Sequence, residues 1–183
     1  MIRVMLVDDH ALVRMGFRML LADAHVEVVA ECDSGEQACA RYAQVNPDVV
    51  VIYVGVNDVW HKTLLGTGTD PDKFEKFYLA ILKKLKEKNI KAVLCTPAVV
   101  GEKTDMSNPL DGDINRYSNI IRDIAKKNGL PLIDLRKKFL DYELANNPEN
   151  KEKEILTYDR VHMNAKGNQF LAEVMWLTIR SLN

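Results

Sequence analysis

An aspartate and a histidine three residues apart, Asp159 and His162, are the side chains of this 183-residue sequence best suited to acid–base chemistry. At this spacing the carboxylate can accept a hydrogen bond from one imidazole nitrogen while the other nitrogen faces a substrate. Asn57, within a Gly-x-Asn-Asp block at residues 55–58, carries an amide that can donate to a developing oxyanion. One such donor can contribute roughly 3 kcal/mol of transition-state stabilisation. The three side chains could therefore serve proton transfer and the stabilisation of a developing negative charge.

Two further groups lie where the first two apolar runs of the sequence end. Asp8 and Asp9 follow residues 2–7, and two carboxylates without a third ligand predict at most a weak Mg²⁺ site. Ser34 is interpreted as a helix cap before Gly35, with a substitute nucleophile as the alternative. No other metal or cofactor motif is present, so no cofactor is predicted.

Apolar runs and helix-period segments alternate along the chain. Strands are expected at residues 2–7, 26–30, 48–54, 91–96 and 130–133, and helices at 11–22, 35–45, 70–88, 113–127, 135–145 and 164–181. This alternation predicts an α/β fold: a parallel sheet covered on both faces, in three doubly wound layers. Functional residues are then expected at the carboxyl ends of the strands. One domain over residues 1–183 is expected.

The composition is that of an ordinary globular protein, with 47% hydrophobic and 28% charged residues and a net charge of −1. A near-neutral balance gives no electrostatic reason to expect a nucleic acid or membrane partner. No apolar run approaches a membrane span of roughly 20 residues, and no signal peptide precedes the first strand. Cys32, Cys39 and Cys95 have no paired spacing, so reduced thiols and a cytoplasmic location are expected.

The cationic residues are unevenly distributed along the chain. Residues 1–50 contain four arginines and no lysine, and carry a net charge of −4; residues 51–183 contain 16 lysines and five arginines, with a net charge of +3. Lysine and arginine are largely interchangeable on an exposed surface. The abrupt change near residue 50 is therefore either chance clustering or the junction of two sequences of different origin.

The first 50 residues resemble the amino-terminal half of a two-component response-regulator receiver. The resemblance rests on the run from Ile2 to His10, on residues 33–36, and on the Pro-Asp-Val-Val run at residues 47–50. It implies Mg²⁺ binding by Asp8 and Asp9 and phosphorylation of an aspartate after the third strand. That position holds Tyr53, which has no carboxylate, and the lysine expected after the fifth strand is also missing. A phosphorelay receiver is therefore only the second alternative function.

Residues 51–183 resemble SGNH (GDSL-type) hydrolases, through the Gly-x-Asn-Asp block at 55–58 and the Asp-x-x-His block at 159–162. The resemblance implies ester hydrolysis with Asp159, His162 and Asn57 as catalytic residues, and with the backbone N–H of Gly35 in the oxyanion hole. The serine nucleophile of that family directly follows the first strand, where this chain has Asp9. A carboxylate would attack an ester to give a mixed anhydride, a poorer route than an acyl-serine.

These observations predict a chimera, with a receiver-like fragment replacing the corresponding part of an SGNH hydrolase. The change of resemblance near residue 50 places the junction inside or just before the third strand. Both families imply a flavodoxin-like/SGNH architecture with five parallel strands in the order 2-1-3-4-5, so one sheet could form across it. The expected function is a folded chimera without intact activity. Weak hydrolysis of a small ester or acetylated substrate is the alternative. The splice is typical of an engineered fragment exchange, with a natural fusion as the other origin.

Overall fold

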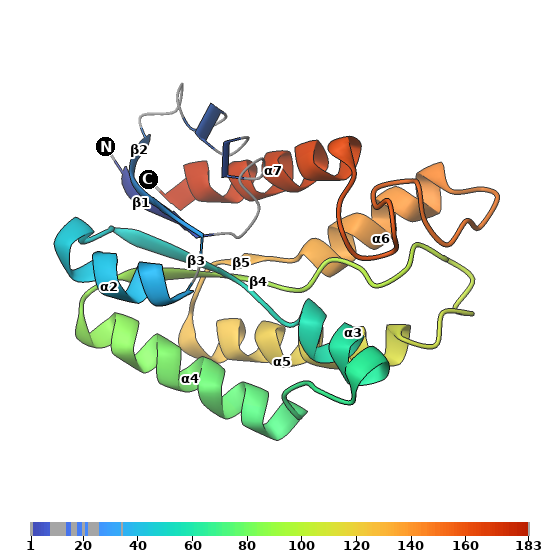
Figure 1. Cartoon of the computed structure of the whole chain (residues 1–183), viewed down its shortest axis with the longest axis horizontal. Coiled ribbons are helices and arrows are strands. Elements are labelled where there is room, and N and C mark those ends of the chain that lie inside the picture. Colours follow the sequence, from blue (N-terminus) through green and yellow to red (C-terminus); the bar gives the residue numbers. More distant parts are fainter. Residues whose placement is uncertain are drawn as a thin grey trace.

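Five parallel strands form one sheet in the computed structural model, which describes residues 2–7, 14–15, 18–19, 21, 26–33 and 35–182 (Figure 1). The strands are β1 (Ile2–Val7), β2 (Val26–Cys32), β3 (Val49–Tyr53), β4 (Lys91–Cys95) and β5 (Leu132–Ile133). They are arranged in the order β2-β1-β3-β4-β5, and all the described pairings are parallel. The predicted strand order is confirmed.

Helices cover both faces of this sheet. They are α2 (Gly35–Val45), α3 (Val56–Leu65), α4 (Pro71–Glu87), α5 (Asp111–Asn128), α6 (Leu135–Asn146) and α7 (Ala165–Ile179), the last followed by the short 3₁₀ helix η1 (Arg180–Leu182). In Figure 1, α4 and α5 lie on one face, and α6 and α7 on the other. The three-layer prediction is therefore confirmed. Within the described residues, no helix combines the length and hydropathy needed to cross a membrane.

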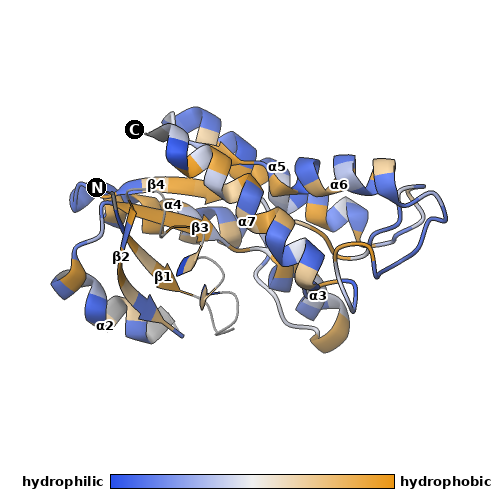
Figure 2. Cartoon of the chain, turned by 90° about the horizontal axis from the view of Figure 1, so that it is seen from above, coloured by the Kyte–Doolittle hydropathy of each residue, from blue (hydrophilic) through white to orange (hydrophobic). Residues whose placement is uncertain are grey.

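Alternate residues of the strands contact different helix layers. In β4, Ala92 and Leu94 pack in a cluster with side chains of α4 and α5, whereas Val93 and Cys95 pack with side chains of α6 and α7. Successive strand residues point to opposite faces, and burial on both faces explains why β3 and β4 are almost continuously apolar. Figure 2 shows the hydrophobic strands between more hydrophilic outer helix faces.

Helix α3 is absent from the sequence-based expectation. It begins after Gly55, whose φ of 114° lies in the left-handed region, and it ends at Gly66 with a φ of 66°. Only glycine adopts such conformations readily, so the two glycines delimit a helix too short to show a clear apolar period. The expected helix at 11–22 lies mostly outside the described residues. The residues described within it, 14, 15, 18, 19 and 21, are helical. The other boundaries shift by at most two residues.

Both hydrophobic core clusters of the described chain begin at β3. One contains Ile52 and the other Val49, and neither includes a described residue from β1 or β2. The strand β1 pairs with β3 at Val4 and Val49, whereas β3 and β4 pair along their whole length. Two hydrogen bonds between Asp48 and the backbone of Arg3 reinforce this junction. Among the described residues, backbone pairing joins β1 to β2 and to β3, and the side chains of Val4, Ala30 and Cys32 are buried.

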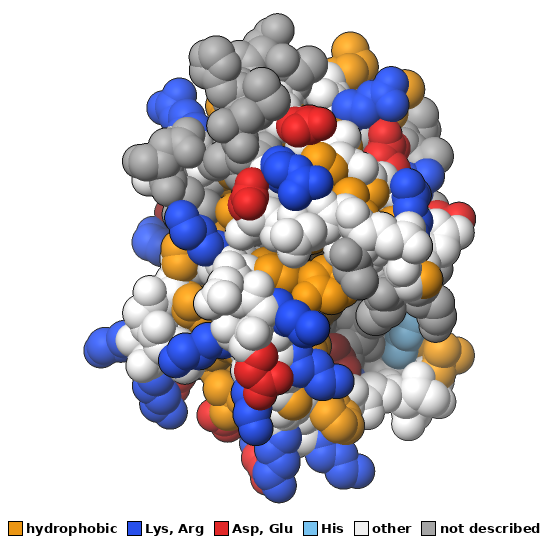
Figure 3. Space-filling view, turned by 90° about the vertical axis from the view of Figure 1, so that its left-hand side faces the viewer, with side chains coloured by type: hydrophobic (Ala, Val, Ile, Leu, Met, Phe, Trp, Pro, Cys, Tyr) orange, Lys and Arg blue, Asp and Glu red, His pale blue; other side chains and the backbone are white. Residues whose placement is uncertain are grey.

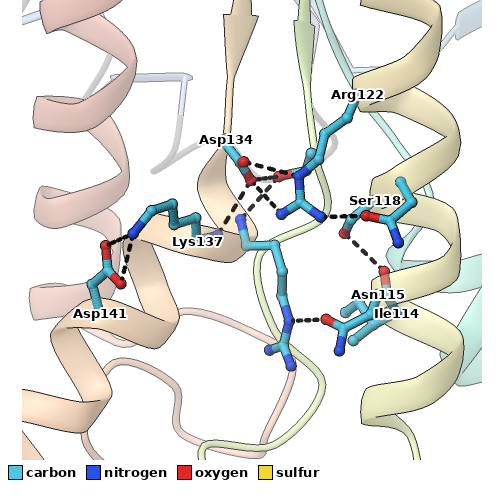
Figure 4. A network of polar contacts seen from close by, with 10 residues as sticks. Ile114, Asn115, Ser118, Arg122, Asp134, Lys137 and Asp141 are labelled. Atoms are coloured by element: carbon cyan, nitrogen blue, oxygen red, sulfur yellow. Dashed lines mark hydrogen bonds and ion pairs between the residues drawn. The ribbon is translucent and has the colours of Figure 1, made fainter.

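A polar network joins the carboxyl ends of β4 and β5 to the helices beside them (Figure 4). Asp134, which follows β5, accepts two hydrogen bonds from the Arg122 guanidinium, at 2.9 and 2.8 Å, and a third from the Thr96 hydroxyl at 3.2 Å. Burial alone would raise the pKa of Asp134. The Arg122 hydrogen bonds and charge outweigh burial, so the pKa lies below its ordinary value. Asp134 therefore stays ionised at neutral pH.

Replacing Asp134 by Asn is expected to lower the free energy of unfolding by about 2 kcal/mol at neutral pH, because a bidentate, charge-assisted contact is lost. A carboxyl with a lowered folded-state pKa stabilises the fold above its unfolded pKa, and this contribution is lost as the pH falls through the folded pKa. The difference between variant and parent should therefore shrink in acid, as measured by urea unfolding across that range. Asp141→Asn is the control, since Asp141 forms an exposed pair with Lys137 and should change stability by less than about 0.5 kcal/mol. Equal effects of the two changes would contradict this assignment.

Candidate active site

Asp159 and His162 form a closed turn in the loop between α6 and α7. The Asp159 Oδ2 atom lies 2.7 Å from Nδ1 of His162, while Oδ1 accepts the backbone N–H groups of Val161 at 3.0 Å and His162 at 2.8 Å. Burial acts to raise the pKa of Asp159, but the hydrogen bonds from His162 and the backbone lower it overall. The carboxylate is therefore ionised at neutral pH and fixes both the turn and the orientation of the imidazole.

The polypeptide on either side of this turn is held by backbone pairing. Thr157 forms an antiparallel bridge with Met163, and the N–H of Tyr158 donates to the carbonyl oxygen of His162 at 3.0 Å. Between them, Arg160 has a φ of 86°, a left-handed conformation that costs a non-glycine residue of the order of 1 kcal/mol. The surrounding hydrogen bonds impose this conformation.

Helix α7 begins directly after the turn. Its cap residue, Asn164, accepts the N–H of Gly167 through its side chain at 2.9 Å, and its own N–H donates to the carbonyl of Leu156 at 2.9 Å. A polar cap of this kind satisfies N–H groups that the first turn of a helix leaves unpaired. The residues at 164–167 therefore place the end of the Asp159–His162 turn on a rigid element.

Two aromatic rings enclose the His162 imidazole. Trp60 of α3 meets it edge-on with ring centroids 5.4 Å apart, and Tyr158 stacks on it at 5.7 Å with an interplanar angle of 15°. The His162 side chain is 35% exposed, so the ring is held in place and still reached by solvent. Sequence reasoning missed both aromatic residues; the position of Trp60, three residues after Asn57, was the available signal.

Asn57 lies in the first turn of α3, directly after β3, and is exposed. It shares a helix face with Trp60, because side chains three residues apart lie one above the other. The contact between Trp60 and His162 therefore brings the face that carries Asn57 towards the Asp159–His162 turn. The neighbouring Asp58 has a structural role, since its Oδ1 accepts the N–H of Thr69 at 2.9 Å.

The remaining predicted site residues lie in the amino-terminal part of the chain. Gly35 opens α2 after β2, so it stands at the carboxyl edge of the sheet with β1 between its strand and β3. Asp8, Asp9 and Ser34 lie outside the described residues. Among the described residues, no group of three or more His, Cys, Asp or Glu side chains could hold a metal ion.

A groove of about 760 Å³ opens at the opposite end of the sheet, where the strands begin. Its walls are the last turns of α4 and α5 and the start of β4, with apolar residues such as Leu82, Ile90 and Pro131 beside Lys83, Lys86 and Lys91. Figure 3 shows hydrophobic side chains among lysines and arginines on this end of the molecule. The groove is remote from His162, so it is separate from the candidate active site.

Comparison with known proteins gives the class that this fold and turn define. Residues 26–170 match the GDSL-like Lipase/Acylhydrolase family, to which the chain belongs. The crystal structure of the acetyl xylan esterase AlAXEase is 47% identical, covers 97% of this chain and 98% of that chain, and has a TM-score of 0.83. Axe2, an acetylxylan esterase from Geobacillus stearothermophilus, has the same fold, with 19% identity, a TM-score of 0.72 and 97% and 94% coverage.

A second similarity, to the response regulator GacA, covers a short stretch of the chain. The response regulator GacA of Pseudomonas viridiflava is 47% identical over 55 residues, which is 30% of this chain and 26% of that protein. The chain thus spans about a quarter of the length of this relative. The resemblance to a receiver inferred from the sequence is supported over this short stretch, and the resemblance to GDSL hydrolases is confirmed over most of the chain.

Proposed function

We propose that this chain is an acyl hydrolase of the GDSL type with an incomplete site, which retains the base, its orienting acid and the oxyanion donor but has no serine nucleophile. The observation that carries this proposal is the 2.7 Å contact between Asp159 and His162, beside the helix that bears Asn57. The sequence after β1 reads Asp8-Asp9-His10, so a carboxylate stands where the nucleophile is expected. Ester hydrolysis should be absent or residual.

Each retained residue has a definite task in ester hydrolysis. His162 would take the proton of the attacking hydroxyl and return it to the leaving alcohol, with Asp159 holding the imidazole in the required tautomer. Asn57 would donate a hydrogen bond to the oxyanion of the tetrahedral intermediate, with the Gly35 N–H as the second donor. Attack by Asp9 would expel the alcohol and leave a mixed anhydride on the carboxylate, which water must then cleave. This residual route is the alternative function.

An acetylated sugar, such as an acetylated xylo-oligosaccharide, is the substrate class favoured by similarity. AlAXEase is an acetyl xylan esterase and is 47% identical over nearly the whole of both chains. An acetyl group is small, and a half-exposed histidine flanked by Trp60 and Tyr158 suits an ester carried by a sugar, because aromatic rings offer sugars an apolar stacking face. Small acetyl esters are therefore the substrates to assay.

In this proposal the chain is also a single-domain chimera, with residues 1–50 derived from a receiver and residues 51–183 from a hydrolase. Two observations support the junction near β3. The lysine-free segment ends there, and the 55-residue similarity to GacA has nearly that length. The shared strand order allows one sheet to form across the junction, and an engineered exchange of fragments is the origin that fits these features best.

The test compares the parent chain with His162→Ala on p-nitrophenyl acetate. Because the histidine has no serine to activate, the two rates should agree within about twofold. Turnover by the parent that is lost in His162→Ala would overturn the proposed incompleteness. Incubation with acetyl phosphate, followed by intact-mass measurement, should show no phosphoryl adduct, because Tyr53 replaces the acceptor carboxylate; a stoichiometric adduct would instead favour the receiver function.

A further inference from the structure

A fully buried carboxylate, Glu102, binds the loop that leads into the Asp159–His162 turn. Its side chain accepts three consecutive backbone N–H groups: from Ile155 at 2.8 Å, Leu156 at 2.7 Å and Thr157 at 2.5 Å. A carboxylate has two oxygens that only accept hydrogen bonds, so it matches three converging N–H donors. The Glu102 carboxylate thus supplies hydrogen-bond acceptors for the backbone N–H groups of an irregular loop, as a neighbouring strand does in a sheet.

The backbone around Glu102 also holds both sides of that loop. The N–H of Glu102 donates to the carbonyl of Glu152 at 3.0 Å, and the N–H of Gly101 donates to the carbonyl of Arg160, inside the turn, at 2.7 Å. The Glu102 carbonyl in turn accepts the side-chain amide of Asn147 at 2.8 Å. In Figure 1 the segment after β4 and the loop between α6 and α7 meet at the same end of the molecule. Residues 101–102 are therefore hydrogen-bonded both to the turn and to the loop that precedes it.

A second buried carboxylate, Glu143 of α6, lies in the same region. It is fully buried, and within the described residues neither of its carboxylate oxygens has a hydrogen-bond partner. The charged groups that act on it are Glu102, Arg136 of the same helix, and Asp111 of α5, which is paired with Arg136 at 2.7 Å. Burial, reinforced by the negative charge of Glu102, raises the pKa of Glu143 to about 8, although Arg136 opposes this rise.

We propose that Glu102 and Glu143 act as a pair that positions the Asp159–His162 turn. Glu102 is the carboxylate that accepts the loop amides, and Glu143 is a neutral neighbour that adds no second negative charge beside it. Two carboxylates that share a buried site do not both ionise readily. Loss of the proton from Glu143 in mild alkali places a second negative charge beside the one that holds the loop. The loop over 155–157 should then loosen while the rest of the fold persists.

Glu143→Gln tests the neutral member of the pair, because the amide cannot ionise and has nearly the same shape. In the parent, the contribution of Glu143 to thermal stability should be lost as the pH rises from about 4.5 to about 8, since the folded state still binds a proton that the unfolded state has already released. The variant should lack this decline, so that its Tm advantage over the parent grows with pH. A constant Tm difference across this range would overturn the role of Glu143.

Glu102→Gln tests the charged member, with Glu149→Gln as the same change at an exposed position of the following loop. Amide hydrogen exchange should show protection of Ile155, Leu156 and Thr157 reduced by about tenfold or more in Glu102→Gln alone. Amides of α5 report global stability and should keep their protection. Unchanged protection of the three loop amides, or an equal loss in α5, would overturn the positioning role.

The consequence for catalysis rests on the proposed function, whereas both measurements above use the parent chain and need no turnover. In an Asp9→Ser background that hydrolyses esters, Glu102→Gln should lower kcat by about tenfold or more with little change in KM, because a displaced base impairs the chemical step rather than binding. A rise in KM with unchanged kcat would overturn the positioning role. If Asp9→Ser is inactive but Glu102→Gln shows the expected loss of amide protection, only the proposed function would be refuted.

Discussion

Asp9→Ser is expected to create an esterase, with His162-dependent hydrolysis of p-nitrophenyl acetate about 10³-fold above the parent chain. Under the proposed function, serine supplies the nucleophile that the site lacks, and the Asp159–His162 pair would take its hydroxyl proton. In the same proposal, the change also removes a carboxylate from the position at which the nucleophile is expected. The measurement is kcat/KM at neutral pH for parent and variant side by side.

The size of this gain depends on how well the amino-terminal fragment places residue 9. A displacement of about 1 Å costs a factor of about 10², so if the chain is the proposed chimera, imperfect packing at its junction would make the gain smaller. Asp8→Ser is the matched control, because it introduces the same side chain one residue earlier and should leave the rate at the parent level. Asn57→Ala in the Asp9→Ser background should cost about 10²-fold or more, as expected for an oxyanion donor. A folded Asp9→Ser chain with no gain would refute the assignment of position 9.

The layers followed from the sequence because buried parallel strands are continuous apolar runs, and helices with capping residues are easily delimited. Asp70-Pro71 at the start of α4 and Gly129 at the end of α5 are examples, and the structure has both. The strand order followed instead from the resemblance to two families that share it. Helix α3 was missed because glycines in left-handed conformations, Gly55 and Gly66, delimit it. The conformation of a glycine depends on the surrounding fold, which a single sequence does not display.

The site was predictable to the extent that its residues are close in sequence. Asp159 and His162 are three residues apart, so a turn is enough to join them, and their 2.7 Å contact matches the expected pairing. Trp60, Glu102 and Glu143 reach the same region from separate elements, and only the packing of those elements brings them together. A buried glutamate gives no signal in a sequence, because most glutamates are exposed.

Gly167→Ala is expected to destabilise the fold by about 3 kcal/mol and to displace the support of the Asp159–His162 turn, because α7 and the preceding loop are in close contact here. A Cβ atom on Gly167 would lie 1.9 Å from the carbonyl oxygen of Leu156 and 3.2 Å from Sδ of Met163. The carbonyl oxygen belongs to the backbone that Glu102 holds from the other side through the Leu156 N–H. The Leu156 backbone therefore cannot move away from the added Cβ atom without breaking its hydrogen bond to Glu102.

Gly112→Ala is the matched control, because Gly112 lies in the first turn of α5, as Gly167 lies in the first turn of α7, and no atom lies within 4 Å of its added Cβ. Alanine is favoured over glycine in a helix by about 0.5–1 kcal/mol, so this variant should be as stable as the parent or slightly more stable. Urea unfolding of the two variants beside the parent measures both effects. The substitution is chemically the same at both positions, so changes of opposite sign in the free energy of unfolding would isolate the contact with Leu156. Equal unfolding midpoints would instead show that α7 can move away from the loop and that the turn does not depend on this contact.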